Sequence, residues 1–216
     1  MSAVAHIDEY KTGKLFTDEN RGDLSWNGYE TNVLLRNRGI VVREGRNIPV
    51  FSDVAMALGT DDPGDARGIA LLDFDHDGDL DIAINHNPGD TGRTSDIPAI
   101  LYENRVGQKR NWLAIDLEGV KSNRDAVGAK IQLVAGKLSL FRHVQGGSAY
   151  AGQMTQRIYF GLDQQERVDS LTVTWPSGLV ERFTSLEVNH SIHIVEGQNL
   201  VTPGETEPQS SPGGGM

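Results

Sequence analysis

The sequence predicts an all-β protein, and three observations support this prediction. Short segments recur in which every second residue is apolar, the pattern of a strand with one buried face. Clusters of turn-forming residues separate these segments. The 25 glycines and the apolar fraction of 38% suit a chain with many tight turns, and 216 residues are enough for one large or two small cores.

A first β unit is predicted over residues 25–110, after a polar segment at residues 1–24. The string Asn32–Asn37 is typical of a short strand, and a similar string recurs later in the chain at Ala99–Asn104. Weak internal repetition of this kind favours blade-like β units. One blade and part of another would leave strand edges unpaired, and such edges can pair with a second chain.

A second β unit is predicted over residues 111–197, where the alternation is strongest. The alternating apolar positions are Leu113, Ile115 and Leu117; Ile131 and Leu133; Ile158, Phe160 and Leu162; Leu171, Val173 and Trp175; and Ile192 and Ile194. Short alternating strands at this spacing predict a sandwich or a barrel. The tail at residues 198–216 consists largely of polar residues, glycine and proline and is expected to be flexible.

An acidic loop between two predicted apolar strands, 68–72 and 80–84, is the strongest functional signal. Asp73, Asp75 and Asp77 occupy alternate positions, and a glycine follows that lets the backbone turn sharply. Calcium binds six to eight oxygen ligands in a flexible shell, which three converging carboxylates begin to form. The loop is therefore predicted to bind Ca²⁺ rather than Mg²⁺.

The remaining ligands of this predicted site follow the turn. In such loops the seventh position supplies a backbone carbonyl, here that of Asp79, and a later carboxylate, here Asp81, closes the shell. An EF-hand would place glutamate at position twelve between helices, whereas this position is Ile84 in a predicted strand. The alternative is a solvated acidic turn, in which five aspartates would repel one another. His76 is interpreted as a bystander.

The two halves of the chain resemble two known families. The run from Gly68 to Asp81, with Leu101–Asn104, resembles an FG-GAP or VCBS repeat of integrin-type propellers. The second half is similar to the UnbV (ASPIC) domain. The residues that carry this second resemblance are Asn111–Leu113, Ser122–Ala129, Gly146–Tyr150, Phe160–Leu162 and Trp175–Gly178.

The resemblance implies a partial propeller-like unit with a calcium loop, followed by a β-sandwich-like domain. The chain has one complete calcium loop and too few strands for a whole propeller. The family is associated with cell-surface or secreted calcium-binding proteins, including the cartilage acidic protein group. It therefore implies an extracellular or cell-surface location, although the N-terminus has no visible secretory signal and a cytoplasmic location stays open.

Further short motifs have structural readings beside the functional ones. Arg21-Gly-Asp23 matches the tripeptide read by integrins, but a given tripeptide also arises by chance. His190 and His193 could share a metal on a helix, but on the predicted strand they face opposite sides. Ser122–Asp125 is either a polar binding site or a turn closed by its own side chains, with Arg124 and Asp125 paired.

The aromatic residues and the bulk properties narrow the choice further. Trp112, Phe160 and Trp175 fall on alternating strands and are predicted to be core rather than a ligand platform. The net charge of −10 argues against a nucleic-acid partner. The lack of cysteine excludes disulfides and thiolate sites, and no apolar run reaches the ~18 residues of a membrane span.

These observations predict a calcium-binding, non-catalytic module of extracellular structure or adhesion. Its expected partners are further copies of the chain, paired through exposed strand edges, or another extracellular protein or glycan. The alternative is a calcium-dependent enzyme that acts on a small molecule or glycan. A deep pocket beside the loop, holding a residue with a strongly shifted pKa, would favour that alternative.

Overall fold

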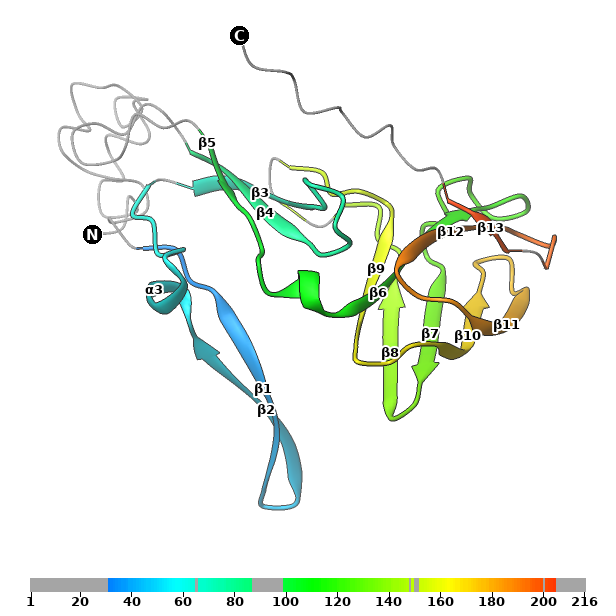
Figure 1. Cartoon of the computed structure of the whole chain (residues 1–216), viewed down its shortest axis with the longest axis horizontal. Helices are drawn as coiled ribbons and strands as arrows, with labels where there is room; N and C mark the ends of the chain where they lie inside the picture. Colours follow the sequence, from blue (N-terminus) through cyan, green and yellow to red (C-terminus); the bar gives the residue numbers. More distant parts are fainter. Residues whose placement is uncertain are drawn as a thin grey trace, which may run out of the picture. The chain divides into compact units, whose positions relative to one another are not determined.

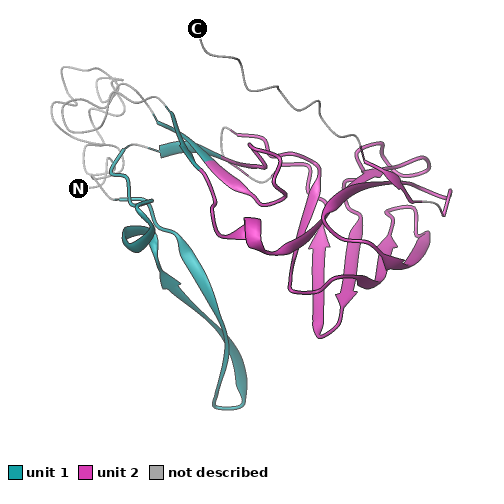
Figure 2. Cartoon of the chain, viewed as in Figure 1, with its two compact units in different colours: residues 1–69, 83–102 teal, residues 70–82, 103–216 magenta. Residues whose placement is uncertain are grey.

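A computed structural model describes residues 31–64, 66–86, 99–147, 149, 152–199 and 201–204. The regular secondary structure of the described residues is almost entirely β-strand, which confirms the all-β prediction (Figure 1). Two compact units can be distinguished, one of residues 1–69 and 83–102, the other of residues 70–82 and 103–216 (Figure 2). This division places the acidic loop with the second unit.

The first unit contains a two-stranded hairpin. Strands β1 (Leu35–Arg43) and β2 (Arg46–Asp53) pair antiparallel, with a bulge in β1 between Asn37 and Ile40. The turn residues Glu44 and Gly45 both have positive φ, as a tight two-residue hairpin turn requires. A single helical turn, α3 (Ala55–Leu58), follows and ends at Gly59 in the left-handed conformation.

Three further strands, β3 (Ala66–Leu72), β4 (Asp81–His86) and β5 (Ala99–Tyr102), form a sheet in the order β3-β4-β5. Strands were predicted close to each of these positions. The acidic loop connects β3 to β4, so strands flank it on both sides, as predicted. No sheet in the described part of the chain closes on itself. The propeller-like interpretation of residues 25–110 therefore stays a prediction.

The second unit holds two four-stranded sheets, in the orders β11-β10-β7-β8 and β13-β12-β6-β9. Their strands are β6 (Asn111–Glu118), β7 (Lys130–Ala135), β8 (Leu138–His143), β9 (Ile158–Asp163), β10 (Val168–Thr174), β11 (Val180–Leu186), β12 (His190–Val195) and β13 (Val201–Pro203). β6 and β12 are parallel, whereas the other pairs are antiparallel. Strand β13 lies in the tail that was expected to be flexible. A strand forms there because it pairs with the edge of β12.

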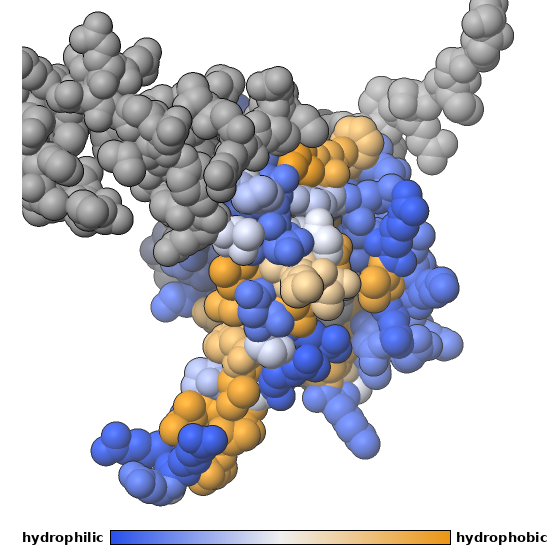
Figure 3. All heavy atoms as spheres, turned by 90° about the vertical axis from the view of Figure 1, so that its left-hand side faces the viewer, coloured by the Kyte–Doolittle hydropathy of each residue, from blue (hydrophilic) through white to orange (hydrophobic). Residues whose placement is uncertain are grey.

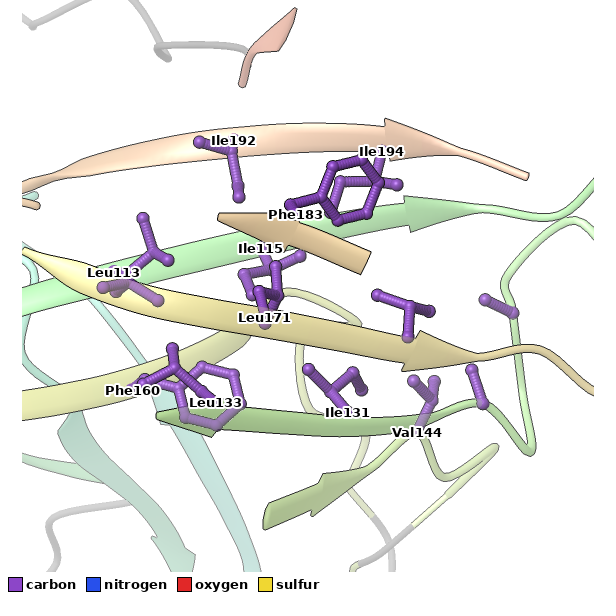
Figure 4. Packing of buried hydrophobic residues seen from close by; sticks show 14 of the residues in the cluster. Leu113, Ile115, Ile131, Leu133, Val144, Phe160, Leu171, Phe183, Ile192 and Ile194 are labelled. Carbon is purple, nitrogen blue, oxygen red and sulfur yellow. The ribbon is translucent and has the colours of Figure 1, made fainter. Parts of the chain in front are cut away.

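The core of the second unit is formed by the alternating residues of both sheets. Figure 4 shows Leu113, Ile115 and Phe160 from one sheet meeting Leu133 and Leu171 from the other. The predicted alternation is therefore the one that builds this core. Trp175 and Phe160 are buried in it as predicted.

On β6 the outer face is partly covered, so Ala114 is buried although it alternates with the core residues Leu113 and Ile115. The prediction that Trp112 belongs to the core is wrong. Trp112 lies on that outer face, only partly buried, and contacts the acidic loop at Gly78. None of the helices in the described ranges is long and apolar enough to cross a membrane.

Candidate metal centre

The acidic loop is fixed at both ends by strands and in the middle by glycine. Asp73 follows β3 directly, and Asp81 is the first residue of β4. Gly78 has a φ of 91°, which a side chain would make unfavourable. A Cβ atom at this position would also lie 1.8 Å from the Trp112 indole. Gly78 is thus required by the backbone and by the packing on β6.

Three of the five predicted ligands meet in space. Asp73, Asp75 and Asp81 each offer a carboxylate oxygen, and these atoms lie within 4.8 Å of one another. Asp81 is only 1% exposed, Asp73 is partly buried and Asp75 is exposed. The cluster is therefore open to solvent on the side of Asp75. The cluster can hold a metal ion by its geometry and by the charge of its oxygen atoms.

Hydrogen bonds orient the carboxylates of this cluster. Asp81 Oδ2 accepts the N–H of Phe74 at 2.8 Å, and its Oδ1 accepts the N–H of Asn104 at 2.7 Å. Asp73 Oδ2 accepts the N–H of Gly78 at 3.1 Å. The loop is therefore closed upon its own backbone and connected to the segment after β5.

Two loop carboxylates keep a buried oxygen that has no hydrogen-bond partner. Asp77 Oδ1 accepts the N–H of Asp79 at 3.0 Å, but Asp77 Oδ2 and Asp73 Oδ1 accept no hydrogen bond. Buried polar atoms are almost always satisfied in folded proteins, so such orphans need an explanation. A bound cation would satisfy both oxygens, and an all-oxygen donor set fits a hard divalent ion.

The electrostatics of the loop also fit a cation. Burial, then the charge of Asp77, raises the pKa of Asp73, although the Gly78 hydrogen bond partly offsets this. Burial and the neighbouring carboxylates Asp77 and Asp81 raise the pKa of Asp75 as well. Like charges close together disfavour ionisation, and a divalent ion between them reverses that effect.

Asp79 differs from the other loop aspartates. Its two carboxylate oxygens are buried without a hydrogen-bond partner, and they face Gly107, where an added Cβ would lie 2.3 Å from Asp79 Oδ2. Burial and the four other loop aspartates raise the pKa of Asp79 to about 6. Asp79 is not among the three clustered carboxylates. Coordination of a metal ion by the Asp79 carbonyl stays a prediction. It is compatible with a side chain that lies outside the cluster.

The Ser122–Asp125 segment is a turn, but it also serves a buried carboxylate that sequence reasoning missed. Glu196 Oε2 accepts the N–H groups of Val120, Lys121 and Ser122, each at 2.7 Å. The hydroxyls of Ser122 and Ser177 donate to its other oxygen. Burial alone would raise the pKa of Glu196, but these hydrogen bonds lower it to about 2.

The turn itself is closed by Asn123, whose side chain bonds both the N–H and the carbonyl of Val127 at 2.8 Å. Arg124 and Asp125 form no ion pair in the described structure, in contrast to the expected local pairing. The segment is a structural turn rather than an open polar binding site.

A second buried glutamate explains the Trp175–Gly178 motif. Glu181 accepts the indole N–H of Trp175 at 2.6 Å and the N–H groups of Gly197 and Asn199 at 3.1 and 2.9 Å. The only sequence signal for Glu181 and Glu196 was a charged residue at or just after a strand in an apolar region. Asn104, which supports Asp81, could have been found from its place in the repeated string.

His190 and His193 are not among the clustered metal-ligand candidates of the described residues. His190 and His193 lie on β12, as predicted. His193 Nε2 lies 3.4 Å from Glu118, while His190 Nδ1 lies 3.1 Å from the carbonyl of Val188. The described structure therefore gives these histidines different neighbours. Arg21-Gly-Asp23 lies outside the described residues.

Comparison with known proteins supports part of the predicted resemblance. Residues 119–201 match the family model described as ASPIC and UnbV. The chain is 30% identical over 159 residues to cartilage acidic protein 1 of Xenopus tropicalis, which covers 73% of this chain. The same protein of Homo sapiens is 30% identical over 158 residues, covering 72% of this chain, and that of Mus musculus 29% over 154, covering 70%.

These matches support the UnbV and cartilage acidic protein group as relatives. Each alignment covers 23% of the relative, so the chain spans only a part of their length. The UnbV (ASPIC) resemblance of the second half is thus confirmed. The FG-GAP or VCBS resemblance of the first half stays a prediction.

Proposed function

We propose that this chain is a calcium-binding, non-catalytic module of extracellular structure or adhesion. The observation that carries the proposal is the cluster of Asp73, Asp75 and Asp81, together with the buried oxygens of Asp73 and Asp77 that lack hydrogen-bond partners. The relatives are named after cartilage and acidity, and this chain has a net charge of −10. Their name supports an extracellular location.

In this proposal the ion is Ca²⁺, because the loop supplies many oxygen atoms and calcium takes six to eight oxygen ligands. The side chains of Asp73, Asp75, Asp77 and Asp81 bind it, and Asp79 adds its carbonyl oxygen. Bound calcium neutralises the mutual repulsion of these carboxylates. The loop then keeps its contacts with Trp112 and Asn104, which connect it to the second unit.

Thermal unfolding with and without calcium tests the proposal. If only the folded state binds the ion, calcium at about a hundred times its dissociation constant adds ~2.7 kcal/mol to the stability. Melting should fall on adding a chelator and recover with Ca²⁺, and less with Mg²⁺. A metal-free protein whose melting is unaffected by calcium would overturn the proposal.

Two variants test the ligand set by calorimetric titration. Asp75→Ala removes a clustered carboxylate and should abolish measurable calcium binding, whereas Asp79→Asn should bind nearly as well, because only its carbonyl is used. Asp125→Ala, an exposed aspartate outside the loop, is the matched control. Equal losses for Asp75→Ala and Asp79→Asn would show that the ligand assignment is wrong.

Self-association is a second part of the proposal, and the hairpin is the surface for it. Cross-strand neighbours share a face. One face holds Leu35, Asn37, Ile40, Val42, Asn47, Pro49, Phe51 and Asp53. Its large apolar side chains are exposed, Val42 by 70%, and Figure 3 shows apolar surface along the hairpin with a polar tip.

In this proposal the apolar face of the hairpin is covered by a second copy of this chain. Residues 35–53 carry four arginines against one glutamate and one aspartate, although the whole chain has a charge of −10. A basic ribbon on an acidic protein complements the charge of another copy. An isolated two-stranded ribbon is also only marginally stable in water, which favours its coverage.

The enzymatic alternative has weaker support. A cleft adjoins the loop, and burial raises the pKa of Tyr159 in its wall. However, its described lining contains no aspartate or glutamate, whereas most glycoside hydrolases use a pair of them. The arrangement is better suited to binding a ligand than to hydrolysing a glycan.

A further inference from the structure

The cleft beside the acidic loop lies within the second unit. It has a volume of about 350 Å³ and is bounded by residues 142–145, Gly147 and residues 153–159. Leu71 and Leu80, which flank the acidic loop, complete its wall. Ligand pockets range from about 300 to 1,000 Å³, so this one suits a single small molecule or one unit of a polymer.

Arg142 occupies an unusual position at the edge of this cleft. Along β8, Leu138 and Leu140 face Ala135 and Leu133 in the core-facing row, and the next position in that row is Arg142, opposite Ile131. An arginine therefore replaces the apolar side chain that the row predicts. Its guanidinium carbon lies 5.4 Å from the centre of the buried Phe160 ring.

The positive charge of Arg142 is available to a ligand. Arg142 Nη1 donates to the carbonyl of Phe141 at 3.0 Å, and within the described residues the guanidinium contacts no carboxylate. Arg157, the other arginine of the cleft, is held by Asp116, whose two oxygens accept from Nε at 3.0 and 3.1 Å. Arg142 is thus the group that can pair with an anion.

The remaining rim offers groups that match hydroxyls. Gln145, Gln153 and Gln156 line the cleft, and each amide both donates and accepts hydrogen bonds. A sugar hydroxyl does the same. Leu71 and Leu80 supply an apolar surface on which the C–H face of a sugar ring can lie. Donor–acceptor amides, an apolar wall and an arginine that contacts no carboxylate among the described residues together match a hydroxyl-rich anion.

We infer that the cleft binds an acidic sugar unit, with Arg142 on its carboxylate and the glutamine amides on its hydroxyls. The inference rests on the proposed function only in that calcium holds the acidic loop, which contains Leu80 and follows Leu71 on β3, and in that such glycans are extracellular. The unit is either a free uronic acid or the acidic end of a glycan chain.

The inference is tested by titrating the calcium-loaded full chain with glucuronate and recording the chemical shifts of its amide groups by NMR. Shifts should appear at residues 142–145 and 153–159 and not at the indole N–H of Trp175. Glucose, which lacks the carboxylate, and acetate, which lacks the hydroxyls, should each bind at least about tenfold more weakly. A glucuronate-terminated disaccharide that binds more tightly than glucuronate identifies a glycan end as the ligand; equal affinity identifies the free acid.

Substitutions of arginine sharpen the test. Arg142→Met should weaken glucuronate binding by about tenfold or more, and Arg142→Lys should restore part of it through charge alone. Arg182→Met, an exposed arginine on β11 that does not line the cleft, should bind like the wild type. Should Arg142→Met fail to fold, the chemical-shift map of the wild-type chain still tests whether glucuronate binds in the cleft.

The outcomes separate this inference from the proposed function. Glucuronate that causes no shifts in the cleft, or binds no better than glucose, overturns the inference. Calcium binding is measured separately through the amide of Gly78. If calcium binds while glucuronate does not, only the inference fails; if glucuronate binds while calcium does not, only the proposed function fails.

Discussion

The hairpin of the first unit and the sandwich of the second show how the same local pattern can have opposite results. Both contain antiparallel strand pairs with alternating apolar residues. In the sandwich the alternating residues of two sheets meet and are buried, as for Phe160 at 0% exposure. In the hairpin no second layer covers the apolar face within the described structure, and Phe51 is 51% exposed. Burial thus depends on a facing layer, which alternation alone does not specify.

The largest expected difference is between the two phenylalanines. Phe160→Ala should lower the free energy of unfolding by about 3–5 kcal/mol, because it leaves a cavity in the core. Phe51→Ala should change it by less than about 0.5 kcal/mol if the hairpin is uncovered. Urea unfolding of the calcium-loaded chain measures both. A comparable loss for Phe51→Ala at low protein concentration would mean that the hairpin is buried in the single chain.

Two glycines with positive φ provide the next comparison. Gly78→Ala should cost about 2–5 kcal/mol, because backbone strain adds to a clash with Trp112. Gly39→Ala in the hairpin bulge should cost only the strain, about 1–2 kcal/mol, since nothing lies within 4 Å of its added Cβ. Thermal melting compares them. Equal costs would show that the loop does not pack on β6 through Gly78.

The buried carboxylate of Glu196 gives the sandwich a pH dependence. Its folded pKa of about 2 lies below its ordinary value of 4.5, so its contribution to stability is present above pH 4.5. That contribution is lost as the pH falls from 4.5 through about 2, because the unfolded state binds the proton first. Glu196→Gln should be less stable than the wild type at neutral pH and should lack this part of the acid dependence. Denaturant unfolding between pH 2 and 7 tests this, with Glu187→Gln, an exposed glutamate, as control.

Sequence reasoning found the features that rest on local pattern. The strands of the sandwich, its core and the spacing of the acidic loop follow from alternation and from the run of aspartates. It missed Glu181 and Glu196, because no periodicity marks a buried carboxylate and most of their hydrogen-bond donors come from other segments of the chain. It also missed strand β13, because Val201–Pro203 is too short to alternate and forms only beside the edge of β12.

The smallest expected effect concerns the hairpin itself. If a second copy covers its apolar face, Val42→Lys should weaken self-association while leaving the stability of the isolated chain almost unchanged, since Val42 is 70% exposed. Lysine on an otherwise apolar strand face opposes face-to-face packing of two copies. Light scattering over a concentration series, in calcium, measures the effect, and Val180→Lys on the exposed surface of β11 is the control.

Because Arg43 and Arg46 lie together on the opposite face, raised salt should weaken the association further if acidic surface of the partner contacts them. A wild-type chain that stays monomeric at high concentration would contradict self-association through the hairpin.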